Sequence, residues 1–311
     1  MRDMNEIVYI DRRTKQRKTE KIYGHLFLKM FYGEGFFSRL FFHTVLPFMA
    51  RISFFSRLYG FFQKSTLSRF KVCPFIETFH VDAEEFLDPV ESFRSFNDFF
   101  IRRLKPHARP IVPGDEKAIL PADGRYLVFE NISTVDGFLV KGQKFSLVEL
   151  LVDEELAKRY ADASMVIARL CPTDYHRFHF PCECVPGPAH LINGPLFSVN
   201  PLALRKNIHF LSENKRMVSC LETTHFGSVL YIEIGATCVG TIHQTYTAGF
   251  PVAKGDEKGY FSFGGSCIIL LFEAKKIVFD PDLIEASSQK IETLGLFGQS
   301  LGIRPLATDY R

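Results

Sequence analysis

A glycine-rich step that leads directly into an apolar run constrains this chain more than any other feature. The segment Lys254 to Cys267 contains Gly264-Gly265-Ser266, and the apolar run Ile268 to Phe272 follows. Glycines adopt backbone angles that are closed to other residues, and here they leave the Gly265 carbonyl open to close approach. Such a step before an apolar run is typical of a turn into a strand. The sequence therefore predicts a buried strand directly after Ser266.

The same residues also suit self-cleavage. The Ser266 hydroxyl can attack the preceding carbonyl and shift the acyl group from nitrogen to oxygen. Elimination of the ester would leave a pyruvoyl group, an electron sink comparable to pyridoxal phosphate. A motif this short is only a hypothesis, and a plain turn is the ordinary interpretation, so other segments must decide between the two.

Length and composition indicate a soluble globular protein. The 311 residues suit one large domain or two. A chain of this length buries enough surface to be stable without disulfide bonds or structural metal ions. Seven scattered cysteines, an odd number, favour a reducing compartment over a disulfide framework. The polar, charged start from Met1 to Lys18 contains no apolar stretch of the kind found in secretory signals, so no signal is predicted.

The N-terminal region is both basic and rich in phenylalanine. Residues 1–71 hold 14 lysines and arginines against five acidic residues. Helical spacing places one set of apolar side chains along a single face: Phe37, Phe41, Phe48, Ile52, Phe55, Tyr59 and Phe62. Pro47 is expected to separate two helices or to kink one. No run in this region is long enough to span a membrane.

Two interpretations of this region stay open. One is an amphipathic helical hairpin that packs on the protein's own core. The other is a pair of helices in a membrane surface, with phenylalanines in the acyl boundary and basic residues at anionic headgroups. Nucleic acid is the less favoured partner, because the segment carries so much bulky apolar surface.

Downstream of residue 80 the pattern changes to a helix, a linker and then short strands. Residues Asp88 to Leu104 are predicted to form a helix, with Ser95 or Asn97 as a cap. A rigid linker is expected after it, at Pro106, Pro110 and Pro113. Another helix is expected at Leu147–Tyr160. Short β-like runs fill most of residues 118–279: Tyr126–Phe129, Met165–Leu170, Val229–Ile234, Val239–Thr245 and Cys267–Phe272. We therefore predict an α+β fold, with a predominantly antiparallel β core and an N-terminal amphipathic helical layer.

Three groups of residues in the predicted core suit chemistry. The first is Asp123-Gly124, whose ordinary interpretation is a turn. The second holds His176 and His179, and imidazoles titrate near neutrality. The third is the Gly265-Ser266 step. A zinc site formed by His176, His179, Cys182 and Cys184 is an alternative, but its spacing is tighter than that of two separated ligand pairs.

Five motifs in order carry a resemblance to a known family. They are Pro121-Ala122-Asp123-Gly124, Tyr175-His176-Arg177-Phe178-His179, Val199-Asn200-Pro201, Ile234 to Gly240, and Lys254-Gly255-Asp256 through Ser266. Together they resemble phosphatidylserine decarboxylase over roughly residues 90–280. Cys267 is a modest departure, because the family often has a small hydroxyl residue there.

The resemblance implies a pyruvoyl enzyme that is made as a proenzyme. Asp123, His179 and Ser266 would form a charge-relay triad, in which Asp123 orients His179 and His179 removes the proton from Ser266. Cleavage between Gly265 and Ser266 would give chains 1–265 and 266–311, which stay associated. The pyruvoyl group derived from Ser266 would form a Schiff base with phosphatidylserine, release CO₂ and yield phosphatidylethanolamine. His176 would reprotonate the product carbon.

The resemblance also implies where the enzyme works. Residues 1–80 would form the membrane-associating region and residues 81–311 the decarboxylase domain. Phosphatidylserine in an anionic membrane would be the partner, at the cytoplasmic side of the cell membrane and in a peripheral position, with no metal and no nucleic acid. Homo-oligomer formation is left open. A metal-dependent or serine-hydrolase enzyme and a non-catalytic membrane-binding module remain alternatives, although no Gly-x-Ser-x-Gly elbow surrounds Ser266.

Overall fold

A large, mostly antiparallel sheet forms the centre of the protein. The computed structural model describes residues 6–23, 30, 32, 35, 38, 40–44, 46, 53–236, 241–264 and 266–305, without the side chains of 53–57 and 59. The strands of the large sheet are β1 (Val8–Asp11), β2 (Arg17–Thr19), β4 (Gly124–Phe129), β5 (Ser164–Leu170), β7 (Cys184–Pro186), β8 (His190–Ile192), β9 (Arg216–Thr223), β10 (Ser228–Gly235), β13 (Ser266–Phe272) and β15 (Glu292–Gly295). Among the described residues they follow the order β2-β1-β15-β4-β5-β13-β10-β9-β7, with β8 also on β9. The pair β1–β15 is parallel.

Strand β13 lies at the middle of this sheet and is buried along its whole length. It pairs with β5 on one side and with β10 on the other. Its side chains alternate between two core clusters: Cys267 and Ile269 belong to one, Ile268 and Leu270 to the other. Burial on both faces explains why this strand is a continuous apolar run rather than an alternating pattern.

Two smaller sheets accompany the large one. The first consists of β6 (Arg177–His179), β11 (Ile242–Gln244) and β12 (Glu257–Phe261), and the second of β3 (Lys117–Ile119), β14 (Val278–Phe279) and β16 (Ser300–Ile303). Phe178 of β6 and Phe261 of β12 join the same core cluster as Ile268 of β13. This packing brings the histidine-bearing strand β6 onto the sheet face toward which alternate residues of β13 point.

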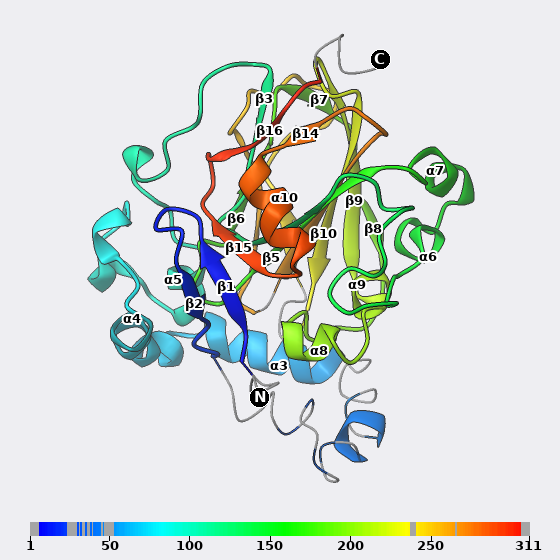
Figure 1. The fold of residues 1–311 in the computed structure, drawn as a ribbon. Coiled ribbons are helices and arrows are strands. Elements are labelled where there is room, and N and C mark those ends of the chain that lie inside the picture. Colours follow the sequence, from blue (N-terminus) through cyan, green and yellow to red (C-terminus); the bar gives the residue numbers. More distant parts are fainter. Residues whose placement is uncertain are drawn as a thin grey trace.

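Short helices surround the sheets (Figure 1). They are α3 (Ser53–Lys64), α4 (Val72–Phe79), α5 (Phe96–Phe100), α6 (Leu147–Leu151), α7 (Glu154–Arg159), α8 (Pro201–Leu204), α9 (Phe210–Glu213) and α10 (Pro281–Ser288). There are 3-10 turns at Thr66–Lys71, Ala83–Glu85, Val90–Ser92 and Pro106–Ala108. Helix α10 lies across β4 and β15, whereas α3 lies below the sheets at the N-terminal end of the molecule (Figure 1).

A third core cluster connects the N-terminal helices to the segment before β13. Its buried members are Val72, Phe75, Phe86, Phe93, Phe96, Phe99, Phe100 and Phe263. All but Phe263 come from residues 72–100, so the ring of Phe263 fixes the start of the glycine-rich step against α4 and α5. Aromatic pairs of this kind stabilise a contact beyond the area that they bury.

The α+β prediction is confirmed, but two predicted helices are wrong in extent. Within Asp88–Leu104 only the turn Val90–Ser92 and the helix α5 form, because the backbone of Ser95 is extended and its side chain caps α5 by accepting the Asp98 amide. Ser95 is thus the cap that the sequence predicts. The predicted helix Leu147–Tyr160 is split, because Val152 adopts a left-handed conformation and Asp153 starts a new helix.

Several predictions fall on residues that the structure does not describe or describes in part. Phe37, Pro47, Phe48, Ile52 and the side chains of Phe55 and Tyr59 lie outside the described residues, as do Gly265 and residues 237–240. Phe41 and Phe62 are half-buried, and Phe41 packs against the main core cluster. The strand predicted at Val239–Thr245 is present as β11, over three residues.

Candidate active site

Ser266 is the first residue of β13 and is fully buried. Its backbone lies opposite Leu170 of β5 and Gly235 of β10. In the part of the chain that the structure describes, its hydroxyl oxygen has no hydrogen-bond partner. A buried hydroxyl without a partner costs on the order of 1–3 kcal/mol, so such atoms are rare unless they have a function. The neighbour Gly265 lies outside the described residues, and Gly264 has φ +139°, a backbone angle that favours glycine.

Asn97 of α5 holds the segment that leads to Ser266. The amide of Phe263 donates a hydrogen bond of 3.0 Å to the side-chain oxygen of Asn97. The Phe263 ring packs against Phe96 and Phe100, with centroid distances of 5.1 and 4.9 Å. A helix of the N-terminal half therefore positions the residue three places before Ser266.

His179 is held as a neutral base. Its Nδ1 lies 2.9 Å from the Gly255 carbonyl oxygen, which can only accept, so Nδ1 carries the proton and Nε2 the lone pair. The ring stacks on Phe297 with centroids 3.7 Å apart. Burial lowers the pKa of His179 to about 4. Among the described residues Nε2 has no partner, so the imidazole is free to accept a proton there.

Asp123 immediately precedes β4 and is buried between a cation and a backbone amide. Arg109 donates to both carboxylate oxygens, at 2.9 and 2.7 Å, and the Phe297 amide donates at 2.9 Å. Burial raises the pKa of Asp123, and Arg109 opposes that shift. Asp123 lies in a bend and Gly124 begins β4, so the turn predicted at Asp123-Gly124 is the entry into a strand. A Cβ on Gly124 would lie 2.9 Å from the Arg169 carbonyl oxygen, so this residue is glycine because the strands approach closely.

The structure brings Asp123 and His179 together through Phe297 rather than by a direct bond. The Phe297 amide binds Asp123, and its ring covers the His179 imidazole. His179 Nδ1 is occupied by the Gly255 carbonyl. Among the described residues, no hydrogen bond links Asp123 to His179 or either histidine to Ser266. All three members of the predicted triad are buried, and within the part of the chain that the structure describes Ser266 Oγ and His179 Nε2 have no hydrogen-bond partner.

His176 precedes β6 and is fully buried against Phe100, with ring centroids 3.7 Å apart. Its Nδ1 donates to the Asp174 carbonyl oxygen at 2.9 Å, and its Nε2 has no partner among the described residues. Burial lowers the pKa of His176 to about 3. The expectation that this histidine titrates near neutrality is therefore wrong for the protein without substrate, in which the imidazole is neutral.

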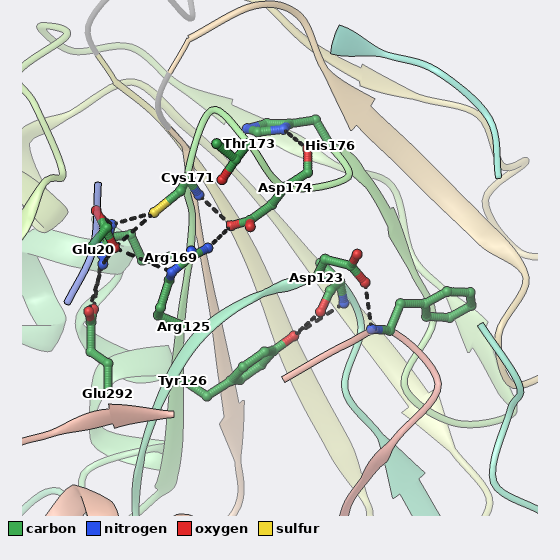
Figure 2. A network of polar contacts seen from close by, with 12 residues as sticks. Glu20, Asp123, Arg125, Tyr126, Arg169, Cys171, Thr173, Asp174, His176 and Glu292 are labelled. Atoms are coloured by element: carbon green, nitrogen blue, oxygen red, sulfur yellow. Dashed lines mark hydrogen bonds and ion pairs between the residues drawn. The ribbon is translucent and has the colours of Figure 1, made fainter. Parts of the chain in front are cut away.

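A buried network of charges fixes the loop that carries His176 (Figure 2). The Asp174 carboxylate pairs with Arg125 and accepts a 2.7 Å bond from the Cys171 amide. Arg102, also buried, donates to the carbonyl oxygens of Thr173 and Asp174. The loop is thus held through the Asp174 side chain and through the backbone carbonyls of Thr173 and Asp174.

The same network extends from Arg169 to both ends of the chain. Arg169 pairs with Glu20, which follows β2, and with Glu292 of β15, at 2.7 and 2.6 Å (Figure 2). Burial would raise the pKa of Glu20, but Arg169 and Arg125 outweigh it and lower that pKa to about 2. Removing one partner of such a buried pair is strongly destabilising, by roughly 3–5 kcal/mol.

The four residues of the alternative zinc site, His176, His179, Cys182 and Cys184, are not arranged around a common point for a metal ion in the described part of the chain. Both histidines donate to backbone carbonyls, and burial raises the pKa of the Cys182 and Cys184 thiols, to about 12 for Cys184. Within the described ranges, no three His, Cys, Asp or Glu side chains are grouped in a way that could hold a metal ion.

Arg109, Asn97 and Phe297 are site residues that the sequence analysis missed. Arg109 lies in the segment interpreted as a rigid linker, and Asn97 was considered only as a helix cap. No local pattern marks any of the three, because each acts on a residue far away in the sequence.

Comparison with known proteins shows the family to which this chain belongs. The sequence model of the phosphatidylserine decarboxylase family matches residues 96–294, which include Asp123, both histidines and Ser266. Among curated relatives, the phosphatidylserine decarboxylase proenzyme of Chlamydia muridarum is 48% identical over 97% of this chain and 99% of its own length. Those of Chlamydia pneumoniae and Chlamydia caviae are 48% and 46% identical, each over 96% of this chain and 98% of their own length. The chain belongs to the phosphatidylserine decarboxylase family.

Proposed function

We propose that this protein is a phosphatidylserine decarboxylase that matures by cleaving itself between Gly265 and Ser266. The observation that carries the proposal is the Ser266 hydroxyl at the start of β13, which is fully buried and has no partner in the described part of the chain. Two neutral imidazoles, His176 and His179, are buried as well, and among the described residues each has an Nε2 without a partner. Relatives of nearly the same length are named phosphatidylserine decarboxylase proenzymes, which supports processing into two chains.

In maturation the Ser266 oxygen attacks the Gly265 carbonyl carbon, and His179 Nε2 takes the hydroxyl proton. The Gly265–Ser266 amide bond breaks, which gives an ester and a free amine on Ser266. Loss of the Ser266 α-proton expels the Gly265 carboxylate, and water then replaces the nitrogen as ammonia. One water is consumed overall, and the small chain begins with a pyruvoyl group. Asp123 supports His179 by its negative charge and by holding Phe297 against the ring.

The residues present fit a pyruvoyl group at this position. Among the described residues, the Nε2 atoms of His176 and His179 have no partner, and a carbonyl group formed at the Ser266 Cα and its substrate could engage them. The group supplies an electron sink for the bond to the departing carboxylate. His176 would deliver a proton to the substrate carbon from Nε2. Because burial keeps this imidazole neutral at rest, we expect the negative charges of a bound phospholipid headgroup to favour the protonated form.

The mass of the purified protein tests this proposal. Under denaturing conditions we expect two chains, 1–265 and 266–311, and the smaller should resist amine sequencing because its N-terminus is a ketone. The matching activity is release of CO₂ from carboxyl-labelled phosphatidylserine. A single intact chain that nevertheless releases CO₂ would contradict the pyruvoyl mechanism, and cleaved protein without activity would contradict the substrate.

We also propose that residues 1–80 associate with the membrane surface in which the substrate lies, in a peripheral position on the cytoplasmic side. Within the described ranges, no helix is both long and apolar enough to cross a bilayer. The segment from α3 to Lys71 does expose large apolar side chains: Leu58, Phe61, Leu67 and Phe70 are each more than half exposed. Lys64 and Arg69 lie among them. Apolar side chains interspersed with cations suit an anionic lipid surface.

Replacing Phe61, Leu67 and Phe70 by serine should release the protein from vesicles of phosphatidylserine and phosphatidylcholine. These side chains are 75%, 71% and 69% exposed, so the variant should keep its fold and its activity on a short-chain soluble substrate. Cosedimentation at low and high salt separates the apolar from the ionic contribution. Phe250→Ser, at an aromatic residue 65% exposed elsewhere, is the control. Full vesicle binding by the triple variant would show that the anchor lies in another part of the chain.

A further inference from the structure

Arg109 joins the N-terminal half of the chain to the candidate active site. Its guanidinium lies between two carboxylates, with hydrogen bonds of 2.8 and 2.9 Å to Glu85 and of 2.9 and 2.7 Å to Asp123. The side chains of Arg109 and Asp123 are 9% and 5% exposed, whereas that of Glu85 is 28% exposed. A fork of this kind fixes both the charge and the plane of the buried carboxylate.

Asp123 in turn fixes the surroundings of His179. The carboxylate oxygen that faces Arg109 Nε also accepts the Phe297 amide at 2.9 Å. The Phe297 ring lies nearly parallel to the His179 ring, at 12° and 3.7 Å. The backbone amide of His179 donates to the Pro121 carbonyl, two residues before Asp123. A rotation of the Asp123 carboxylate would therefore disturb both the position of Phe297 and the stack on His179.

The charge of Asp123 depends on Arg109 in particular. Burial raises the pKa of Asp123, and the hydrogen bonds and charge of Arg109 are the largest opposing influence. Other titratable or charged groups face Asp123 without a hydrogen bond to it: Asp174, Arg102, Tyr126, Tyr175 and, across Phe297, His179. Without Arg109 the buried carboxyl would lose the one cation that hydrogen-bonds to it among the described residues.

We propose that Arg109 is a positioning residue for self-cleavage, which keeps Asp123 ionised and oriented so that Phe297 and His179 are held for proton transfer from Ser266. This inference rests on the proposed function. Glu85 anchors the outer side of the same guanidinium, so the fork also ties the turn Ala83–Glu85, beside the N-terminal helices, to the maturation site.

The test is the pH dependence of cleavage in the Arg109→Met variant. Full-length chain is made by cell-free translation, synthesis is stopped, and the first-order rate of cleavage is followed by gel in buffers on both sides of neutrality. Since the charged form of Asp123 is required, a higher Asp123 pKa moves the acid limb of the profile to higher pH. We expect a move of about 1–3 pH units, the range by which a neighbouring arginine lowers the pKa of an aspartate.

Arg12→Met is the matched control. Arg12 also lies between two carboxylates, Asp280 and Asp282, and its side chain is 11% exposed. Its loss should lower stability by a similar amount without moving the profile. Glu85→Gln leaves the charge beside Asp123 and should keep the acid limb in place. If Arg109→Met cleaves with the wild-type profile, or is slowed equally at every pH, the proposal is wrong.

A double-mutant cycle keeps the proposal testable if Arg109→Met folds poorly. On an Asp123→Asn background there is no charge for Arg109 to maintain, so Arg109→Met or the milder Arg109→Lys should slow cleavage no further. Slowing by the same factor as in the wild type would show that Arg109 acts only on the fold. Cleavage of Ser266→Ala would instead contradict the proposed function itself, so the two failures are distinguishable.

Discussion

Replacement of Ser266 by alanine should leave the chain whole and without decarboxylase activity. The hydroxyl is the group proposed to attack Gly265, and β13 holds it in a fully buried position. Without it neither the ester nor the new N-terminus can form. The intact mass of the purified variant measures this directly, and alanine fits the strand without strain.

Variants of the proposed base, His179, and of Asp123, which supports it, should slow cleavage to different extents in the same mass measurement. His179→Ala should slow cleavage by roughly 10²–10⁴-fold, the usual contribution of a positioned general base. Asp123→Ala should also slow it strongly, because it removes both the charge and the acceptor for the Phe297 amide. Ser262→Ala is the control, since this serine lies in the same segment and its oxygen contacts His243 instead. Normal processing of the three site variants would refute the triad.

His176→Ala should separate maturation from turnover. We expect the variant to cleave at least in part, because the proposed role of His176 begins only when the pyruvoyl group is present. Decarboxylation should fall by roughly 10²–10⁴-fold, the contribution expected of a general acid. The measurement is CO₂ release per mole of small chain with a blocked N-terminus, so incomplete maturation does not distort the rate.

A second histidine provides the comparison for that variant. His243 is half-buried, stacks on Tyr260 and hydrogen-bonds to Ser262. His243→Ala should lose packing but keep turnover per blocked chain close to that of the wild type. If mature His176→Ala turns over phosphatidylserine at the wild-type rate, His176 is a structural residue that packs on Phe100 and its acid role is wrong.

The strand that carries the site could be predicted from sequence because its signal is local and continuous. The run from Cys267 to Phe272 is apolar at every position, and the structure buries every one of these residues. The strands β4, β5 and β10 were found for the same reason. The helix expected at Asp88–Leu104 failed because Ser95 and the packing of several phenylalanines on Phe263 override helical spacing.

The protonation states of the histidines could not be predicted from sequence. An imidazole in a sequence has its ordinary pKa near neutrality, and that value supported an acid role for His176. The structure buries both rings, and this burial lowers the pKa of His176 to about 3 and that of His179 to about 4, although the hydrogen bond of each Nδ1 to a backbone carbonyl opposes the shift. Desolvation is a property of the packed core, so no motif reports it.

The sequence by itself determined the family, the serine proposed to react and the mostly antiparallel β core, because each depends on residue types in a fixed local order. Only the tertiary structure decided what surrounds those residues. It paired Asp123 with Arg109 and Phe297, gave His179 the Gly255 carbonyl, and anchored Phe263 on Asn97. These contacts join residues between 14 and 174 positions apart in the chain, and side chains so distant meet only when the sheets and helices have packed.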